Sequence, residues 1–568
     1  MSKIIIVGGV AGGATAAARI RRLDENAEIT IYERSGFVSY GNCGLPYYIG
    51  GVITDRDELT LQSPEGFWSR YHVCVKVKHE VTAIDPAAKT VTVKNLESGE
   101  TFIDSYDKLL LAPGAKPTMP PLKGLDSSRL FTLRTVEDTL RIKAFIEEAK
   151  PKSAVLVGGG AIGLEMAENL LGLGMEVTVL DAQKQVLSQI DPCMASFVHA
   201  YLKEKGMKLV LGKGVAGFEE KDGKIYTGVD GGETLESELV IFAIGVTPDT
   251  ALAKAAGLKL GLRGSIEVNE KMETSAKDVY AVGDAVQIVN RVSGEKALIA
   301  LAGPANKQAR IAADNLCGGN SAYRGGIGSS VVKLFDLTVA ATGLNEKTAA
   351  ALGLSYEYVI LSPDDHAAYY PGGETMTMKV LFEKGSGKVL GAQIVGKTGV
   401  DKRIDVLATA IYAGMTGSEL KELDLAYAPP FSSAKDPVNM AGFMIENIVT
   451  GKVKQFYLKD LPNLPKDGSV TLLDVRTPEE LVEDGYPEGF SLNIPVDELR
   501  ERIGEVPEGK PVYVMCYSGL RSYVANRILA QKGFECYNFT GGFRFYESVL
   551  SENPVAGAHP CGLKKMEN

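Results

Sequence analysis

Two of the seven cysteines stand among neighbours that suggest sulfur or redox chemistry. The first is Cys43, in the segment FVSYGNCGLPY over residues 37–47, and the next cysteine along the chain is Cys74. Because this region has no C-x-x-C or C-x4-C pair, an internal dithiol is not expected. A single thiolate would instead alternate between a thiol and a mixed disulfide, a persulfide or a sulfenate.

The second is Cys516, which follows an apolar strand over Val512–Met515 and opens the six-residue loop CYSGLR. We expect this loop to lead into a helix over Tyr523–Lys532. Backbone N–H groups of such a loop point at the sulfur, and the helix N-terminus adds positive potential. The pattern therefore favours a thiolate and would also stabilise a persulfide anion.

The other cysteines have no such neighbours, and most are expected to be buried packing residues without a chemical role. They are Cys74, Cys193, Cys317, Cys536 and Cys561. For Cys561, near the C-terminal end, a role as a resolving thiol is an alternative. An odd number of scattered cysteines is not a disulfide framework and favours a reducing, cytoplasmic location. The five histidines show no metal-ligand spacing, so no metal is predicted.

The elements that must position the first thiol begin with a glycine-rich turn near the N-terminus. The turn GGVAGG, over residues 8–13, follows a short apolar strand and opens a helix, although Val10 stands where the usual motif has its middle glycine. Such a turn lets a pyrophosphate approach the helix N-terminus. Glu33 follows the second strand, 20 residues after Gly13, where an acid accepts ribose hydroxyls. The predicted contacts are Gly8, Val10, Ala11, Gly12, Gly13, Glu33 and Arg34.

A second turn, GGGAIG over residues 158–163, is a complete G-x-G-x-x-G motif. Asp181 ends the next predicted strand, 18 residues after Gly163. An acid there favours a free 2′-hydroxyl and repels a 2′-phosphate, so NADH is expected over NADPH. Lys184 follows closely, which leaves some use of NADPH open. The predicted contacts are Gly158, Gly160, Ile162, Gly163 and Asp181.

Length and composition limit the class of protein. The chain has 568 residues, which suggests about four domains, and its 45% hydrophobic and 23% charged residues are ordinary for a soluble globular protein. The net charge of −10 argues against nucleic acid as a partner. No apolar run reaches the ~18 residues of a membrane span, so no membrane partner is expected.

The two turns resemble those of the two-dinucleotide-binding flavoprotein superfamily. The segment VYAVGDA over residues 279–285 is similar to the second FAD motif of that superfamily. The segments LLLAPG over 109–114 and IFAIG over 241–245 are similar to its crossover segments. The resemblance implies FAD at the first turn and NAD(P)H at the second. It adds four cofactor contacts, Ala112, Gly245, Gly283 and Asp284.

The pattern S-x-x-N-C-x-L-P-Y around Cys43 resembles the single-cysteine group of this superfamily, and coenzyme A disulfide reductases most of all. The resemblance implies that Cys43 is the redox thiolate beside the flavin. Ser39 and Asn42 would lie near the flavin and the thiol substrate, and Arg22 would bind the adenine-nucleotide end of coenzyme A. NADH oxidase and NADH peroxidase, with a sulfenate at Cys43, are alternatives. The peroxidases carry a histidine shortly after their glycine-rich loop, and residues 8–14 contain none.

Two later segments, HAAYYPG over 366–372 and YAPPFS over 427–432, resemble the tyrosine motifs of the reductase's dimerisation domain. The resemblance implies a homodimer in which Tyr369 and Tyr427 reach the redox cysteine of the partner subunit. A phenol near a thiolate could donate a proton to the leaving sulfur.

The last segment resembles rhodanese. Cys516 and Arg521 match its C-x-x-G-x-R signature, and Asp474 and Arg476 match an earlier motif of that family. A six-residue loop is the sulfur-carrying kind, although GYPEGF over 485–490 departs from the usual sequence. The resemblance implies that Cys516 and Arg521 are catalytic and that Cys516 holds sulfane sulfur, which it could pass to Cys43. A sulfurtransferase with a flavin redox sensor is the remaining alternative.

The predicted fold class is α/β, with two Rossmann-like FAD/NAD(P)-binding domains, an α+β dimerisation domain and a C-terminal α/β rhodanese domain. The expected domains are FAD-binding over 1–115 and 246–322, NAD(P)H-binding over 116–245, dimerisation over 323–450, a linker over 451–460, rhodanese over 461–552 and a flexible tail over 553–568. The expected enzyme is an FAD-dependent NAD(P)H reductase of CoA disulfide, CoA persulfide or polysulfide. Which of these small molecules it prefers stays open.

Overall fold

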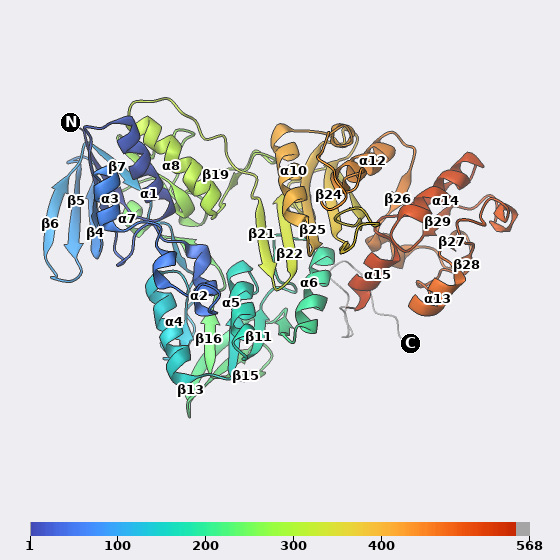
Figure 1. Ribbon diagram of the computed structural model, residues 1–568, viewed down its shortest axis with the longest axis horizontal. Coiled ribbons are helices and arrows are strands. Elements are labelled where there is room, and N and C mark those ends of the chain that lie inside the picture. Colours follow the sequence, from blue (N-terminus) through green and yellow to red (C-terminus); the bar gives the residue numbers. More distant parts are fainter. Residues whose placement is uncertain (1, 552–568) are drawn as a thin grey trace. The chain divides into compact units, whose positions relative to one another are not determined.

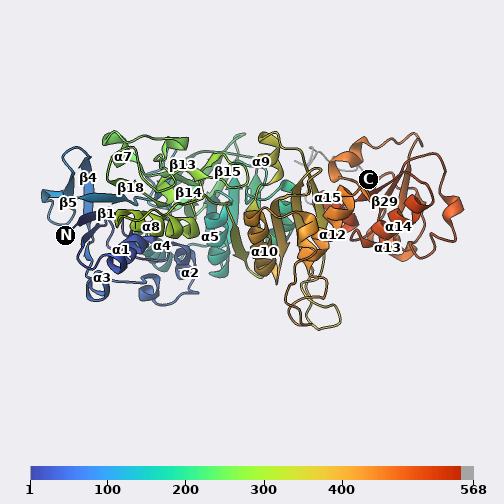
Figure 2. The same cartoon turned by 90° about the horizontal axis from the view of Figure 1, so that it is seen from above.

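The computed structural model describes residues 2–551, so Cys561 and the predicted tail over 553–568 lie outside the described residues. Figures 1 and 2 show the order of the elements along the chain. The chain divides into two compact units, one of Met1–Gln183 and Met207–Gly328, the other of Lys184–Gly206 and Ser329–Asn568. Within residues 2–551, none of the helices has the length and apolar character that crossing a bilayer requires.

The first unit contains a five-stranded parallel sheet in the order β18-β7-β1-β2-β3. Its central strand β1 reads KIIIV and is buried on both faces. Ile4 and Ile6 face a core shared with α1 and α8, whereas Ile5 and Val7 face a core shared with the meander β4-β5-β6. The elements are β1 (Lys3–Val7), α1 (Ala11–Leu23), β2 (Glu28–Tyr32), β3 (Cys74–Lys76), β4 (His79–Asp85), β5 (Thr90–Asn95), β6 (Thr101–Ser105), β7 (Lys108–Leu111), β18 (Val279–Ala281) and α8 (Ala302–Leu316).

A second parallel sheet in the same unit has the order β12-β11-β10-β16-β9 and repeats the strand–turn–helix plan of the first. The antiparallel sheet β13-β14-β15 packs against it through Phe218 and Ile225. The elements are β9 (Leu130–Phe131), α4 (Val136–Ala149), β10 (Ser153–Val157), α5 (Ala161–Gly172), β11 (Glu176–Asp181), β12 (Lys208–Leu211), β13 (Val215–Lys221), β14 (Lys224–Val229), β15 (Thr234–Ser237) and β16 (Leu239–Phe242).

Short elements complete the first unit. Strand β8 pairs with β17, and β19 pairs with β20, both antiparallel. The elements are η1 (Asn42–Gly44), α2 (Leu45–Ile49), η2 (Arg56–Leu59), α3 (Pro64–Tyr71), β8 (Ala115–Pro117), β17 (Val246–Pro248), α7 (Ala251–Ala255), η3 (Leu262–Gly264), η4 (Gly283–Ala285), β19 (Ile288–Val289) and β20 (Lys296–Ala297).

The second unit begins with an antiparallel sheet in the order β21-β22-β25-β24-β23. Strand β25 is buried along its whole length, which agrees with its position in the middle of the sheet. The elements are β21 (Ser330–Leu334), β22 (Leu337–Gly343), α9 (Glu346–Ala351), β23 (Tyr356–Leu361), β24 (Thr377–Glu383), β25 (Val389–Gly396), α10 (Val400–Ala413), α11 (Gly417–Leu420) and α12 (Pro437–Val449).

One expected boundary needs correction, because residues 184–206 belong to the second unit and not to the nucleotide-binding unit. This segment carries helix α6 (Pro192–Glu204), which packs against β22 and β25. Its anchor is Asp191, which is 2.8 Å from the fully buried ammonium of Lys379. The Asp191 backbone N–H also donates to Gln393 at 2.7 Å. A buried ion pair of this kind holds the segment to the sheet, because separating the charges would take a close counter-charge from each buried group.

The last sheet is parallel, in the order β26-β30-β29-β27-β28. The predicted linker over 451–460 is therefore wrong, because β26 lies within it and pairs with β30. The predicted helix over Tyr523–Lys532 also begins earlier, at Leu520, directly after Gly519 in the left-handed region. The elements are β26 (Lys454–Phe456), η5 (Leu458–Asn463), β27 (Thr471–Asp474), α13 (Pro478–Asp484), β28 (Leu492–Asn493), η6 (Ile503–Glu505), β29 (Val512–Met515), α14 (Leu520–Gln531), β30 (Cys536–Phe539) and α15 (Gly542–Ser551).

Candidate functional site

The first glycine turn is shaped by two close backbone approaches. Gly8 has φ of +95°, and a Cβ there would lie 2.2 Å from the carbonyl oxygen of Ala112. A Cβ at Gly13 would lie 1.8 Å from the carbonyl oxygen of Gly8. Helix α1 begins at Ala11 without a side-chain cap and without an acid in its first turn. Its N-terminus can therefore receive a phosphate, as the predicted FAD site requires.

The buried carboxylate of Glu33 lies beside this turn. It accepts hydrogen bonds from the backbone N–H groups of Gly9, at 2.7 Å, and Ser35, at 2.8 Å. Ser39 has φ of +51°, and its N–H donates to the carbonyl of Gly9 at 2.8 Å. These hydrogen bonds bring Glu33 and the start of the Cys43 segment into contact with the first glycine turn. Arg34 instead forms an ion pair with Asp249, at 3.0 Å.

Asp284, in the second predicted FAD motif, forms an ion pair that the sequence did not indicate. Its carboxylate lies 2.8 Å from the guanidinium of Arg134, which is 150 positions away along the chain. The neighbouring Gly283 has φ of +83°, and its N–H donates to Gln308 at 2.7 Å. Arg134 is therefore an additional candidate at the FAD site.

The second turn repeats the geometry of the first. Gly158 has φ of +115°, and a Cβ at Gly163 would lie 2.0 Å from the Gly158 carbonyl oxygen. Asp181 accepts from the backbone N–H of Gly159 at 2.6 Å, as Glu33 does from Gly9. Helix α5 has no side-chain cap at Gly160, and no atom lies within 4 Å of a Cβ placed there. Ile162 and Gly245 are both exposed. These residues fit a second dinucleotide.

Cys43 lies in the 3-10 turn η1, exposed to solvent, with its thiol free. Neighbouring protein atoms displace part of the water around this thiol, and this desolvation raises its pKa. The negative charge of the Glu165 carboxylate raises the pKa further. Asn42 carries a buried side-chain oxygen with no hydrogen-bond partner among the described residues. An unpaired buried acceptor is costly, so this oxygen suits a donor group on a bound cofactor or substrate.

Glu165 is a residue near Cys43 that the sequence reasoning missed. Burial, and then the neighbouring charge of Glu168, raise its pKa to about 7. Its carboxyl also forms a hydrogen bond with the Tyr47 side chain, four residues after Cys43. Helix α5, which carries Glu165, packs closely on α2. A Cβ at Gly50, directly after α2, would lie 2.0 Å from the side chain of Asn169 in α5. In the sequence, Glu165 lies shortly after the second glycine turn, and this position is the feature from which it could have been identified.

Among the three arginines at the end of α1, only Arg22 is exposed. Arg19 forms an ion pair with Asp314 at 2.8 Å. Arg21 is buried and donates to backbone carbonyls, including that of Ala27 at 2.8 Å. Arg22 is thus the arginine of this group that can meet a ligand, and its role toward coenzyme A stays a prediction.

The two predicted tyrosines lie together in the second unit. The hydroxyls of Tyr369 and Tyr427 are 2.7 Å apart, and this bond raises the pKa of Tyr369. Both side chains are exposed. Arg403 of α10, which the sequence did not single out, is buried between their two loops. The loop contacts of Arg403 are the Asp365 carbonyl at 2.7 Å, the Ser432 hydroxyl at 3.1 Å and the Asp436 carboxylate at 3.1 Å.

Cys516 is fully buried at the end of β29. The N–H of Gly519 donates to its Sγ at 3.1 Å, and the thiol lies 3.3 Å from the hydroxyl of Ser522. Helix α15 closes the loop from the other side, because the N–H of Phe543 donates to the Cys516 carbonyl at 2.8 Å. This backbone cradle suits a thiolate or a persulfide anion.

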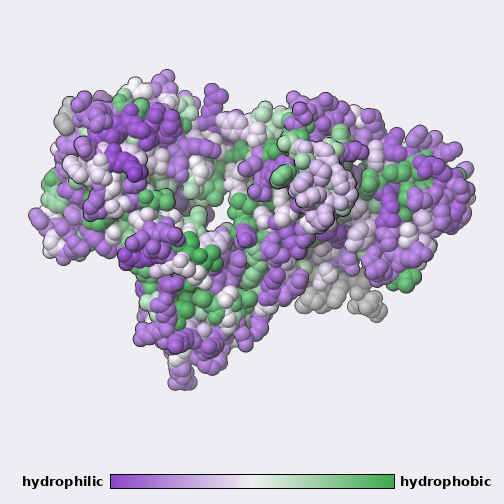
Figure 3. Space-filling model, in the orientation of Figure 1, coloured by the Kyte–Doolittle hydropathy of each residue, from purple (hydrophilic) through white to green (hydrophobic). Residues whose placement is uncertain are grey.

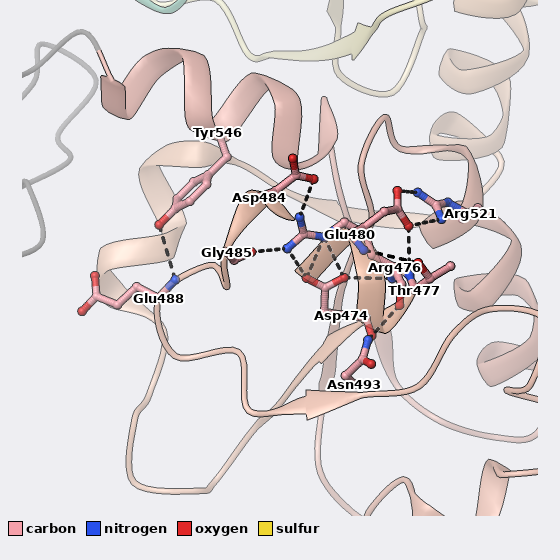
Figure 4. Close-up of polar contacts among 10 residues, drawn as sticks. All are labelled: Asp474, Arg476, Thr477, Glu480, Asp484, Gly485, Glu488, Asn493, Arg521 and Tyr546. Atoms are coloured by element: carbon pink, nitrogen blue, oxygen red, sulfur yellow. Dashed lines mark hydrogen bonds and ion pairs between the residues drawn. The ribbon is translucent and has the colours of Figure 1, made fainter. Parts of the chain in front are cut away.

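Figure 4 shows how the charges beside this loop are paired. Both terminal nitrogens of the Arg521 guanidinium donate to the carboxylate of Glu480, each at 2.6 Å. This pairing lowers the pKa of Glu480 to about 2. Arg476 is fully buried and lies 2.9 Å from Asp474 and 3.3 Å from Asp484. The predicted catalytic residue Arg521 is therefore held in a bidentate ion pair.

Known proteins match nearly the whole chain. The family description pyridine nucleotide-disulphide oxidoreductase matches residues 2–309, the dimerisation domain of that family matches 329–437, and the rhodanese-like domain matches 458–548. The chain therefore belongs to the pyridine nucleotide-disulphide oxidoreductase family. It is an FAD-dependent oxidoreductase that uses a pyridine nucleotide, and the dimerisation-domain match supports a homodimer. The predicted family and fold class are confirmed.

Individual relatives support this family assignment. The coenzyme A disulfide reductase of Staphylococcus haemolyticus (strain JCSC1435) is 37% identical over 449 residues, which are 79% of this chain and 100% of that protein. The crystal structure of reduced Bacillus anthracis CoADR-RHD is 48% identical, with a TM-score of 0.95, over 97% of this chain and 98% of that one. The NAD-dependent persulfide reductase from A. fulgidus is 39% identical, with a TM-score of 0.89, over 96% of this chain and 100% of that one.

Proposed function

We propose that this enzyme uses NADH to reduce sulfur–sulfur bonds in CoA disulfide, CoA persulfide or polysulfide. The observation that carries the proposal is the presence of two different thiols in one chain. Cys43 is exposed and free, and Cys516 is buried in a backbone cradle that suits sulfane sulfur. The coenzyme A disulfide reductase and the persulfide reductase among its relatives support the substrate class.

FAD, when bound, supplies two electrons taken from NADH. The part played by the chain's own thiol is nucleophilic attack. The Cys43 thiolate attacks the terminal sulfur of R–S–S–H, so that a Cys43–S–S–H persulfide forms and R–S⁻ leaves. Two electrons and one proton then return Cys43 to its thiolate and release H₂S. For CoA disulfide the same attack forms a Cys43–CoA mixed disulfide and releases one CoA thiolate.

The substrate would lie along the segment that precedes Cys43. Ser39 and Asn42 come from this segment, and the unpaired buried oxygen of Asn42 supports a ligand there. Exposed Arg22 is the candidate for the nucleotide end of coenzyme A, because a guanidinium pairs well with phosphate. Asp181 supports a preference for NADH, since its carboxylate would repel a 2′-phosphate.

Tyr369 and Tyr427 would come from the partner subunit of the homodimer. Their 2.7 Å hydroxyl pair has one O–H that remains available to donate to a leaving thiolate. Arg403 fixes the two loops that carry them and would act as a positioning residue. We also propose a cytoplasmic location, because none of the six cysteines in residues 2–551 forms a disulfide.

Steady-state kinetics of the purified enzyme test this proposal. NADH oxidation is measured with each sulfur substrate under anaerobic conditions, and oxygen uptake is measured without any sulfur substrate. We expect sulfur-dependent turnover and slow oxygen uptake, with a CoA adduct or a persulfide on Cys43 in the mass spectrum. Rapid NADH-dependent oxygen uptake in the absence of sulfur would instead identify an oxidase that cycles Cys43 through sulfenate.

A further inference from the structure

Strand β23 is an edge strand of the antiparallel sheet in the second unit, and side chains of the last sheet cover that edge. Because β23 pairs with β24 on one side only, its outward backbone groups need partners from elsewhere. The carbonyl of Tyr358 accepts from the Gln455 side chain at 2.7 Å. The N–H of Ile360, two residues later, donates to the Thr540 hydroxyl oxygen at 2.9 Å. Gln455 lies on β26, and Thr540 comes directly after β30.

The contact between Ile360 and Thr540 is fully enclosed. Each of the two residues is 1% exposed. A buried N–H without an acceptor is costly, and no water reaches this one to replace the hydroxyl oxygen. Thr540 is therefore held against β23, a strand in the region that matches the dimerisation domain.

The residues after Thr540 lead directly to the loop that begins at Cys516. Helix α15 begins at Gly542, which has φ of +71°, and a Cβ there would lie 2.4 Å from the Tyr517 carbonyl oxygen. The N–H of Phe543 donates to the Cys516 carbonyl at 2.8 Å, and the N–H of the next residue donates to the Tyr517 carbonyl at 3.0 Å. The first turn of α15 thus lies on the backbone of the loop.

The backbone of this loop sets the surroundings of the Cys516 sulfur. The N–H of Gly519 donates to Sγ at 3.1 Å, and a hydrogen bond to the charged form favours a thiolate over a thiol. The donor is only three positions from the sulfur in one short loop. A shift of the Cys516 backbone therefore changes the length and angle of this hydrogen bond, on which its strength depends.

We propose that Thr540 is a positioning residue for Cys516. Through Thr540 and the start of α15, strand β23 holds the loop in the form in which its N–H group faces the sulfur. The inference rests on the sulfur-carrying role proposed above for Cys516. It makes a strand outside the rhodanese-like match over residues 458–548 part of the sulfur-carrying site.

Substitution of Thr540 leaves the charged side chains around the loop in place. Arg521 donates to both oxygens of Glu480, and Arg476 is paired with Asp474. Arg544, on α15, is partly exposed and adds a positive charge that would move with the start of this helix. The titratable side chains of the elements packed on the loop are Asp474, Arg476, Glu480, Tyr517, Arg521 and Arg544.

The test measures the pH dependence of Cys516 reactivity in the full-length holoenzyme. Iodoacetamide is added across a range of pH, and modification of the Cys516 peptide is followed by mass spectrometry. Thr540→Val keeps the shape of the side chain but removes the acceptor of the Ile360 N–H. We expect its midpoint to move upward by about 0.5 unit or more, and its rate at pH 7 to fall about threefold or more. Thr540→Ser restores the oxygen and should stay within about twofold of wild type.

Gln455→Met is the matched control, because it removes the other side-chain hydrogen bond to β23 without touching the residues that lead to α15. Its midpoint should equal that of the wild-type enzyme. The contribution of the Arg544 charge is measured with Arg544→Gln, and the upward shift caused by Thr540→Val should persist when the two substitutions are combined.

An unchanged midpoint in Thr540→Val would overturn the inference, as would an equal shift in Gln455→Met or a failure of Thr540→Ser to restore the wild-type profile. If Thr540→Val gives no soluble enzyme, Thr540→Ala is measured in its place, and an unchanged midpoint there has the same meaning. Sulfur loading of wild-type Cys516 by glutathione persulfide is measured separately. Its absence would remove the sulfur-carrying role, whereas the pH midpoint judges Thr540 in either case.

Discussion

Cys43 and Cys516 have opposite surroundings. Cys43 is exposed on a 3-10 turn, and both desolvation and the Glu165 carboxylate raise its pKa. Within residues 2–551, no group donates a hydrogen bond to its sulfur. Cys516 is fully buried, yet its sulfur accepts a backbone N–H at 3.1 Å. The Cys43 thiol is accessible to solvent, whereas the Cys516 thiol is enclosed by its loop.

The difference shows how each site obtains its reactivity. The cradle of Cys516 comes from one short loop and the start of one helix. The surroundings of Cys43 come from separate parts of the first unit, with Glu165 on α5 and Arg134 ahead of α4. In the proposed mechanism, cofactor, substrate and partner tyrosines complete that site. Cys43 should therefore respond to distant changes that leave Cys516 unaffected.

The largest effect should come from Cys43→Ser. Loss of the nucleophile is expected to reduce NADH-dependent turnover on every sulfur substrate by about 10³-fold or more. Reduction of the bound flavin by NADH should persist, which stopped-flow absorbance would show. Cys74→Ser is the control, because Cys74 lies on β3 and is not part of the proposed chemistry. Substantial turnover in Cys43→Ser would disprove a role for this thiol.

Removal of both tyrosine hydroxyls, by Tyr369→Phe and Tyr427→Phe, should have the next largest effect. A lost proton donor typically costs about 10²-fold or more, and here the loss should appear in kcat at alkaline pH first. Tyr370→Phe provides the control, since that ring neighbours Tyr369 but lies outside the hydroxyl pair. Unchanged pH–rate profiles in the double variant would show that the pair serves only packing.

Cys516→Ser should have a smaller and substrate-dependent effect. If Cys516 delivers sulfur to Cys43 within the enzyme, its loss removes a high effective concentration of donor, and polysulfide turnover should fall roughly tenfold. CoA disulfide carries no sulfane sulfur, so its reduction should not change and acts as the internal control. Identical rates on all persulfide and polysulfide substrates would eliminate the relay.

The smallest expected effect concerns the pH response of Cys43. The Glu165 carboxylate raises the pKa of the Cys43 thiol, so Glu165→Gln should lower that pKa, by about half a unit or more. Because the pKa of Glu165 is itself about 7, the two enzymes should differ above pH 7 and converge below about pH 6. Alkylation rates of Cys43 against pH measure this, with Cys516 alkylation as the unchanged reference. A shift of Cys43 toward higher pH would refute the electrostatic assignment.

Much of the fold could be predicted because its signals are local. The two glycine turns, and the acids that follow them, depend on residues within one strand–turn–helix unit, and Glu33 and Asp181 both lie against their turns. Errors arose where long-range packing overrode local pattern. A linker was expected over 451–460, but β26 lies within this range and pairs with β30 about 80 positions later. The expected NAD(P)H-binding domain over 116–245 included residues 184–206, but Asp191 of this segment is paired with Lys379.

The sequence by itself determined the fold class, the two dinucleotide turns and the two candidate thiols, because each depends on side chains within a few positions of one another. Only the tertiary structure decided which charges meet. Arg134 pairs with Asp284 across 150 positions, and Arg521 pairs with Glu480 across 41. Glu165 approaches Cys43 because α5 packs on α2. Such pairings depend on how whole helices and strands pack, so the spacing of two charged residues along the chain does not predict whether they lie close together in the fold.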